Sequence, residues 1–119
     1  MPNDEICISL MSGPQDGFQH HFPLQRGKEL VLSIGRNEDC DVPLSYDSQV
    51  SRSHAQLICL LNDDTLIETG QQHRLKIDLV DVGSRNGTLV RDRRLFGERA
   101  ELEPGELVRL GRTWLRVDP

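Results

Sequence analysis

Short apolar runs alternate with turn-forming segments along the whole of this chain, and this pattern limits the fold more than any other feature. Runs such as LVLSIG and LKIDLVDV show the period-2 alternation of strands that are buried on one face. The segments between them, such as SGPQDG, GSRNG and EPGE, are rich in residues that reverse a chain. No comparable helical stripe competes. The chain is therefore predicted to be all-β, an antiparallel β-sandwich whose binding residues lie on loops at one edge.

About eleven strands are predicted from these runs. They cover 6–11, 21–24, 30–35, 41–44, 54–61, 65–68, 75–82, 88–91, 94–96, 106–111 and 114–117. A protruding loop is expected at 70–73, away from the binding loops. Since 119 residues suit one domain of ordinary size, we expect a single domain over 1–119 with its core at about 6–117.

Composition and charge argue against several classes of protein. A hydrophobic content of 36% and a charged content of 28% are typical of a soluble protein, and no apolar run approaches the roughly 18 residues of a membrane span. The start, MPNDEICISL, does not resemble a secretory signal, so a cytoplasmic location and no membrane partner are expected. The net charge of −5 argues against nucleic-acid binding. Only a few clustered arginines hint at a basic stripe: Arg91, Arg93, Arg94 and Arg99.

The three cysteines, Cys7, Cys40 and Cys59, form no CxxC pair and no even set, so they are predicted to be reduced and mostly buried. The adjacent His20 and His21 lack the spaced partner ligands of a zinc site. Neither GxxxxGK[ST] nor GxGxxG occurs. We therefore expect no metal and no cofactor.

The stretch VSRSHAQL, at 50–57, could suggest a serine nucleophile with its base. Such a serine usually needs a sharp supporting turn, such as GxSxG, and an oriented base within reach. No such turn is visible, and in an extended chain Ser53 and His54 would point to opposite faces. The chain is therefore not expected to be an enzyme.

An anion-binding site agrees better with three separated segments, SIGRNEDCD, VSRSHA and DVGSRNGTLV, all at ends of predicted strands. Forked arginine donors, serine hydroxyls and loop N–H groups suit the oxygens of a tetrahedral anion. The candidate residues on the three loops are Arg36, Ser51, Arg52, Ser84, Arg85 and Asn86.

These segments resemble the forkhead-associated (FHA) domain family, whose pattern is GR, then SxxH, then NG. The matches are Gly35 with Arg36, the SRSH at 51–54, and Asn86 with Gly87. The sequences around these motifs, such as VSRSHAQL and PGELVRLG, extend the resemblance over roughly 6–117. The resemblance implies a β-sandwich of eleven strands that binds phosphothreonine peptides through loops at one edge.

The resemblance also implies a role for each matching residue. Phosphate ligands would be Arg36, Ser51 and Arg52, with Arg85 adding a contact to phosphate or peptide. Asn86 would hydrogen-bond the peptide backbone, while Gly35, His54 and Gly87 would be structural. The implied partner is a phosphothreonine-containing protein or peptide, bound in phosphorylation-dependent signalling. Other domains of a longer chain are a further expected partner. A phosphorylation-independent assembly domain with the same fold is the alternative.

Two local features depart from the family pattern. RDRR stands at 91–94 where the family often has Asn-Gly, so Asp92 and Arg93 would have to turn, and a longer loop is expected. NGT at 86–88 fits a glycosylation sequon. Without a secretory signal, we interpret that match as accidental.

Overall fold

The computed structural model describes residues 4–62 and 74–119, and these form eleven strands. The strands are β1 (Glu5–Leu10), β2 (Gln19–Pro23), β3 (Leu30–Gly35), β4 (Val42–Pro43), β5 (Ala55–Asn62), β6 (Arg74–Asp81), β7 (Thr88–Val90), β8 (Arg93–Leu95), β9 (Arg99–Leu102), β10 (Leu107–Leu110) and β11 (Thr113–Asp118). The strand expected at 65–68 and the loop expected at 70–73 lie outside the described residues.

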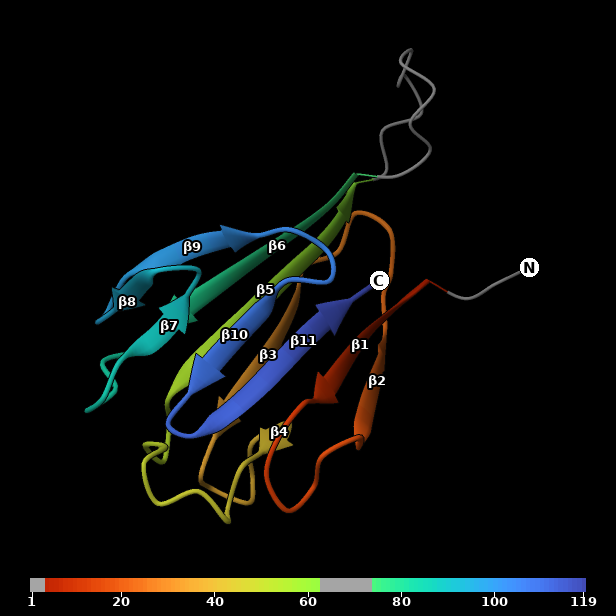
Figure 1. Cartoon of the computed structure of the whole chain (residues 1–119). Helices are drawn as coiled ribbons and strands as arrows, with labels where there is room; N and C mark the ends of the chain where they lie inside the picture. Colours follow the sequence, from red (N-terminus) through yellow and green to blue (C-terminus); the bar gives the residue numbers. More distant parts are fainter. Residues whose placement is uncertain (1–3, 63–73) are drawn as a thin grey trace.

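The strands form two sheets that pack face to face (Figure 1). One has the order β2-β1-β11-β10-β7-β8 and the other β4-β3-β5-β6-β9. Neighbours are antiparallel except β3 and β4, which run parallel with Ile34 opposite Val42. The predicted β-sandwich is therefore confirmed. None of the described residues belongs to a helix long and apolar enough to cross a membrane.

The period-2 pattern of the sequence becomes the core between the two sheets. In β11, Thr113, Leu115 and Val117 are buried while the residues between them are partly exposed. Leu57 and Cys59 in β5 point inward in the same way. The inward residues of both sheets form one apolar cluster. Burying each large apolar side chain contributes about 1.5–3 kcal/mol, so the core holds the strand ends in place.

Two features of the fold differ from the sequence prediction. β9 was not predicted, because its charged residues leave only Ala100 and Leu102 to face the core. The predicted longer loop after β7 is wrong: β7 and β8 are joined by two residues, Arg91 and Asp92, and Arg93 already pairs with Val90. Arg91 permits this tight turn by adopting a φ of 55°.

The arrangement of the strands brings three loops together at one end of the sandwich (Figure 1). These are the β3–β4 loop at 36–41, the β4–β5 loop at 44–54 and the β6–β7 loop at 82–87. Backbone hydrogen bonds join the first two loops, and hydrogen bonds between side chains and backbone groups join the last two. The candidate anion-binding residues of all three sequence segments lie on these loops.

Candidate functional site

The three loops surround an open hollow of about 240 Å³. Its lining includes the five residues that the family resemblance implies as ligand contacts: Arg36, Ser51, Arg52, Arg85 and Asn86. A second hollow of about 280 Å³ is lined by Arg36, Asn37 and Arg52. Residues that are up to 50 positions apart in the chain thus share one concave surface.

Positive charge dominates this surface, although the whole chain carries a net charge of −5. The side chains of Arg36, Arg52 and Arg85 are exposed and form no ion pair with any carboxylate in the described part of the chain. Neither hollow is lined by an aspartate or a glutamate. Three free guanidinium groups around a hollow give it the chemistry of an anion-binding site.

Backbone contacts fix the position of Arg36. Its backbone N–H donates to the carbonyl of Ser51 at 2.9 Å, and its side-chain Nε donates to the carbonyl of Val50 at 3.0 Å. The guanidinium is therefore oriented before any ligand arrives. Its two terminal nitrogens, which form no hydrogen bond with a described residue, remain to donate to an anion.

A close backbone approach explains the glycine before Arg36. A Cβ added to Gly35 would lie 2.1 Å from the carbonyl oxygen of Arg52. Any other residue would push the β4–β5 loop away from the end of β3. Gly35 therefore allows Arg36 and Arg52 to lie on the same surface.

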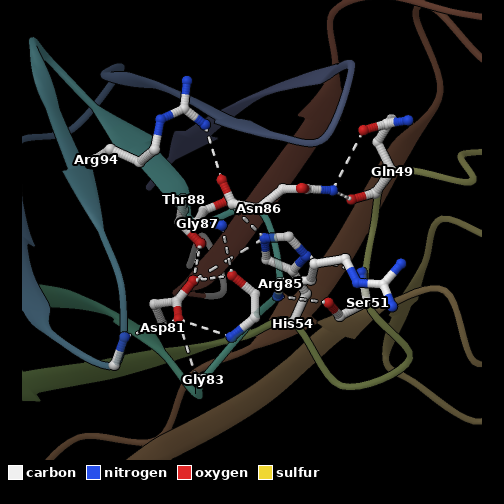
Figure 2. A network of polar contacts seen from close by, with 12 residues as sticks. Gln49, Ser51, His54, Asp81, Gly83, Arg85, Asn86, Gly87, Thr88 and Arg94 are labelled. Atoms are coloured by element: carbon white, nitrogen blue, oxygen red, sulfur yellow. Dashed lines mark hydrogen bonds and ion pairs between the residues drawn. The ribbon is translucent and has the colours of Figure 1, made fainter.

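Ser51 connects two of the loops. Its hydroxyl oxygen accepts a hydrogen bond from the backbone N–H of Arg85 at 3.0 Å (Figure 2). A serine hydroxyl can also donate one hydrogen bond. The Ser51 hydroxyl is thus held at the hollow with its hydrogen free to point toward an anion.

His54 connects the same two loops from the interior of the domain. The imidazole is fully buried, and its Nδ1 accepts a hydrogen bond from the backbone N–H of Ser51 at 3.0 Å. Nε2 must then carry the proton, which it donates to the carbonyl of Gly87 at 2.9 Å (Figure 2). Burial lowers the pKa of His54, although the Gly87 carbonyl and two nearby carboxylates partly oppose this effect. Both ring nitrogens are occupied, so His54 is a neutral brace.

We expect His54→Ala to lower the melting temperature and to weaken ligand binding only through loosened loops. The substitution leaves the Ser51 N–H and the Gly87 carbonyl without their partner, and each buried unpaired group costs about 1–3 kcal/mol. His54→Gln, which keeps one acceptor and one donor, should recover part of the loss. An unchanged melting temperature with collapsed affinity would instead identify His54 as a direct ligand.

Asp81 organises the β6–β7 loop, a role that sequence reasoning missed. Its Oδ1 accepts hydrogen bonds from the backbone N–H groups of Gly83, Ser84 and Gly97 at 2.9–3.0 Å. Its Oδ2 accepts from the hydroxyls of Ser84 and Thr88. Burial of Asp81 raises its pKa, but these hydrogen bonds outweigh burial and lower it to about 2. The only sequence signal was an aspartate just before a Gly-Ser turn.

Ser84 does not line the hollow, contrary to the sequence expectation. It is buried, its hydroxyl donates to Asp81, and the hydroxyl oxygen accepts from the backbone N–H of Gly87 at 2.9 Å. Gly87 itself has a φ of 79°, and an added Cβ would lie 2.6 Å from the side chain of Arg94. Both residues therefore shape the turn that presents Arg85 and Asn86.

Asn86 links the β6–β7 loop to the β4–β5 loop. Its Nδ2 donates to the carbonyl of Gln49 at 2.8 Å and to the side-chain oxygen of Gln49 at 3.2 Å. Arg94 donates to the backbone carbonyl of Asn86 at 2.8 Å (Figure 2). These contacts hold the Asn86 amide at the rim of the hollow, and its Oδ1 forms no hydrogen bond with a described residue.

Asp47 anchors the other side of the β4–β5 loop and was also missed. Its carboxylate is 5% exposed and accepts from the backbone N–H of Gln49 at 3.0 Å within its own loop. It also accepts from the N–H of Arg112 at 2.8 Å and the hydroxyl of Thr113 at 2.7 Å. The loop that carries Ser51 is thereby tied to the β10–β11 hairpin.

The sequence pattern of the FHA domain family matches residues 32–111, which include all three loops of the site. The chain belongs to the FHA domain family. FHA domains are binding modules, and the fold described above is that of the family.

Three similar proteins illustrate the relationship. This FHA domain is 31% identical over 117 residues, 91% of its length, to protein phosphatase 2C 70 of Arabidopsis thaliana, and 32% identical over 84 residues, 70% of its length, to the FHA domain-containing protein PS1 of the same plant. It spans only 18% and 5% of those two proteins. The yeast Dun1 FHA domain, solved with a doubly phosphorylated peptide from Rad53, is 25% identical with a TM-score of 0.68, over 96% of this chain and 73% of that one.

Proposed function

We propose that this FHA domain binds phosphothreonine-containing peptides of a partner protein and so mediates phosphorylation-dependent interactions in signalling. The observation that carries the proposal is the hollow where Arg36, Arg52 and Arg85 are free of carboxylate partners beside the Ser51 hydroxyl. The phosphorylated peptide bound by the Dun1 FHA domain supports it.

Charge explains why phosphorylation would control binding. A phosphothreonine carries about −1.5 to −2 charge and three acceptor oxygens, neither of which unmodified threonine offers. A hydrogen bond to a charged group contributes about 1.5–3 kcal/mol. Arg36, Arg52 and Ser51 would hold the phosphate, so several such bonds would depend on the modification.

The remaining site residues would complete recognition. Asn86 would bind the peptide backbone through its Oδ1, and Arg85 would contact the phosphate or the peptide beside it. Gly35, His54 and Gly87 would hold the loops in register. The proposal requires no metal or cofactor, and the described residues contain no group of three or more His, Cys, Asp or Glu side chains that could hold a metal ion.

The two serines of SRSH should respond differently to substitution. Ser51→Ala is expected to reduce phosphopeptide affinity by about 1–3 kcal/mol, the loss of one hydrogen bond to a charged group. Ser53 is exposed and does not line the hollow, so Ser53→Ala should change phosphopeptide affinity by less than about 0.5 kcal/mol. Titration of both variants with one phosphothreonine peptide makes the comparison, and equal losses would contradict the assignment of Ser51.

An oriented phosphopeptide library tests the proposed function. The immobilised domain should retain phosphothreonine peptides with a preferred flanking sequence, and phosphatase treatment of the library should abolish retention. Retention that survives phosphatase treatment would overturn the proposal and favour phosphorylation-independent assembly instead.

A further inference from the structure

Glu5, Cys7 and His21 form a row on the outer face of β1 and β2, separate from the peptide site. Cys7 lies opposite His21 in the register of the two strands, and Glu5 is two residues before Cys7 on the same face. His21 Nδ1 lies 3.1 Å from Glu5 Oε1, and His21 Nε2 lies 4.0 Å from Cys7 Sγ. Cys7, His21 and Glu5 are thus arranged as a nucleophile, a base and a group that orients the base.

The contacts of His21 determine its tautomer. An ionised carboxylate can only accept hydrogen bonds, so the hydrogen between His21 and Glu5 must be on Nδ1. Nε2 of the neutral ring then carries a lone pair, and this atom faces the thiol of Cys7. In contrast, the buried His54 has its hydrogen on Nε2 and uses both nitrogens for structural bonds.

Cys7 differs from the other two cysteines in its surroundings. Cys59 is buried, and burial raises its pKa to about 12. The thiol of Cys40 donates to the carbonyl of Arg52 at 3.5 Å, and no imidazole is recorded within hydrogen-bond reach of it among the described residues. Cys7 is only half-buried, so the prediction of mostly buried thiols holds fully for Cys59 alone. Cys7 combines access to solvent with a base.

We propose that Cys7 is a thiol modification site that reacts with small disulfides, with His21 as its general base and Glu5 as the residue that orients His21. As Cys7 Sγ forms a bond to one sulfur of the disulfide, its proton passes to His21 Nε2. The S–S bond of the reagent breaks, and the departing thiolate takes that proton. The products are a mixed disulfide on Cys7 and one free thiol, so the number of disulfide bonds is unchanged.

The position of Cys7 separates this modification from peptide binding. β1 and β2 lie at one edge of their sheet, and β7 and β8 lie at the other edge (Figure 1). The β6–β7 loop, which carries Asn86, leads into β7 at that other edge. The row also lies on an open sheet face with half-exposed His21 and Glu5 side chains. Such a surface admits a small reagent and leaves the three binding loops unchanged.

The test is the reaction of the folded domain with 2-hydroxyethyl disulfide, a neutral reagent, with each cysteine followed by mass spectrometry. At pH 7 we expect Cys7 to react at least about tenfold faster than Cys40, and His21→Gln to slow Cys7 by about tenfold, a modest effect for a general base. Glu5→Gln should slow Cys7 by a smaller factor. Cys40 in the same sample is the internal control and should not change.

The pH dependence distinguishes a base from a merely structural residue. At strongly alkaline pH a thiol ionises without the help of a base, because the thiolate is the nucleophile. The wild-type and His21→Gln rates at Cys7 should therefore converge at that pH. Equal rates of the two proteins at pH 7, a constant ratio at every pH, or a Cys40 as fast as Cys7 would each overturn the proposal.

Discussion

Arg36→Ala is expected to lower phosphopeptide affinity by about 2–5 kcal/mol while the domain stays folded, as when one partner of a close charge pair is truncated. The side chain is exposed, so its removal leaves no cavity, and its one side-chain hydrogen bond with a described residue is to the carbonyl of Val50. Its terminal nitrogens are the ones that would meet the phosphate. Calorimetric titration with a phosphothreonine peptide measures the loss, and circular dichroism checks the fold.

Two control variants refine this prediction. Arg36→Lys keeps the charge but not the planar fork, so it should recover only part of the affinity. Arg26→Ala removes an exposed arginine that pairs with Asp4 outside the site, and should leave affinity unchanged. An Arg36→Ala variant that binds as tightly as the wild-type domain would show that this guanidinium is not a ligand.

Asp81→Ala is expected to reduce the free energy of unfolding by about 3–5 kcal/mol, because it deprives several buried donors of their acceptor at once. The donors come from Gly83, Ser84, Thr88 and Gly97, so the whole β6–β7 loop should loosen. Urea unfolding measures the change. Asp92→Ala, in the exposed β7–β8 turn, is the matched control and should change stability by about 0.5 kcal/mol or less. Similar small losses for both variants would contradict the role assigned to Asp81.

The lowered pKa of Asp81 also predicts how stability depends on pH. Because its folded pKa is about 2 against an ordinary value of 3.8, the carboxylate stabilises the fold fully above about pH 4 and loses this contribution as the pH falls toward 2. The difference corresponds to about 2 kcal/mol. Asp81→Asn lacks this titration, so the stability gap between wild type and variant should narrow over that window. A gap that stays constant from pH 5 to pH 2 would contradict the assignment.

Strands in which apolar and polar residues alternate clearly were predictable from the sequence, while strands in which this alternation is weak were not. β3 and β11 carry enough apolar residues on one face to reveal their period. β9 does not, since Arg99 and Glu101 surround its inward residues, and it forms a strand because β6 pairs with it. The β7–β8 turn was missed because Arg91 adopts a left-handed conformation that its residue type disfavours.

At the site, the motifs predicted which residues would meet and gave structural roles to Gly35 and His54, but they did not reveal the two buried carboxylates that anchor the loops. Arg36, Ser51 and Asn86 could be placed on neighbouring loops because each follows or precedes a strand end. The anchoring by Asp47 and Asp81 depends on donors far along the chain, such as the N–H of Arg112, 65 residues after Asp47. Such long-range pairing depends on the packing of the sheets, which no local sequence pattern encodes.

The most direct test of the proposed function compares one library-selected peptide in its phosphothreonine and unmodified threonine forms by calorimetry. If the hollow recognises the phosphate, the phosphorylated form should bind at least about 100-fold more tightly, which is the contribution of one or two charge-assisted hydrogen bonds. The same difference should largely disappear in Arg36→Ala. Equal affinity of the two peptide forms for the wild-type domain would contradict phosphothreonine recognition by this site.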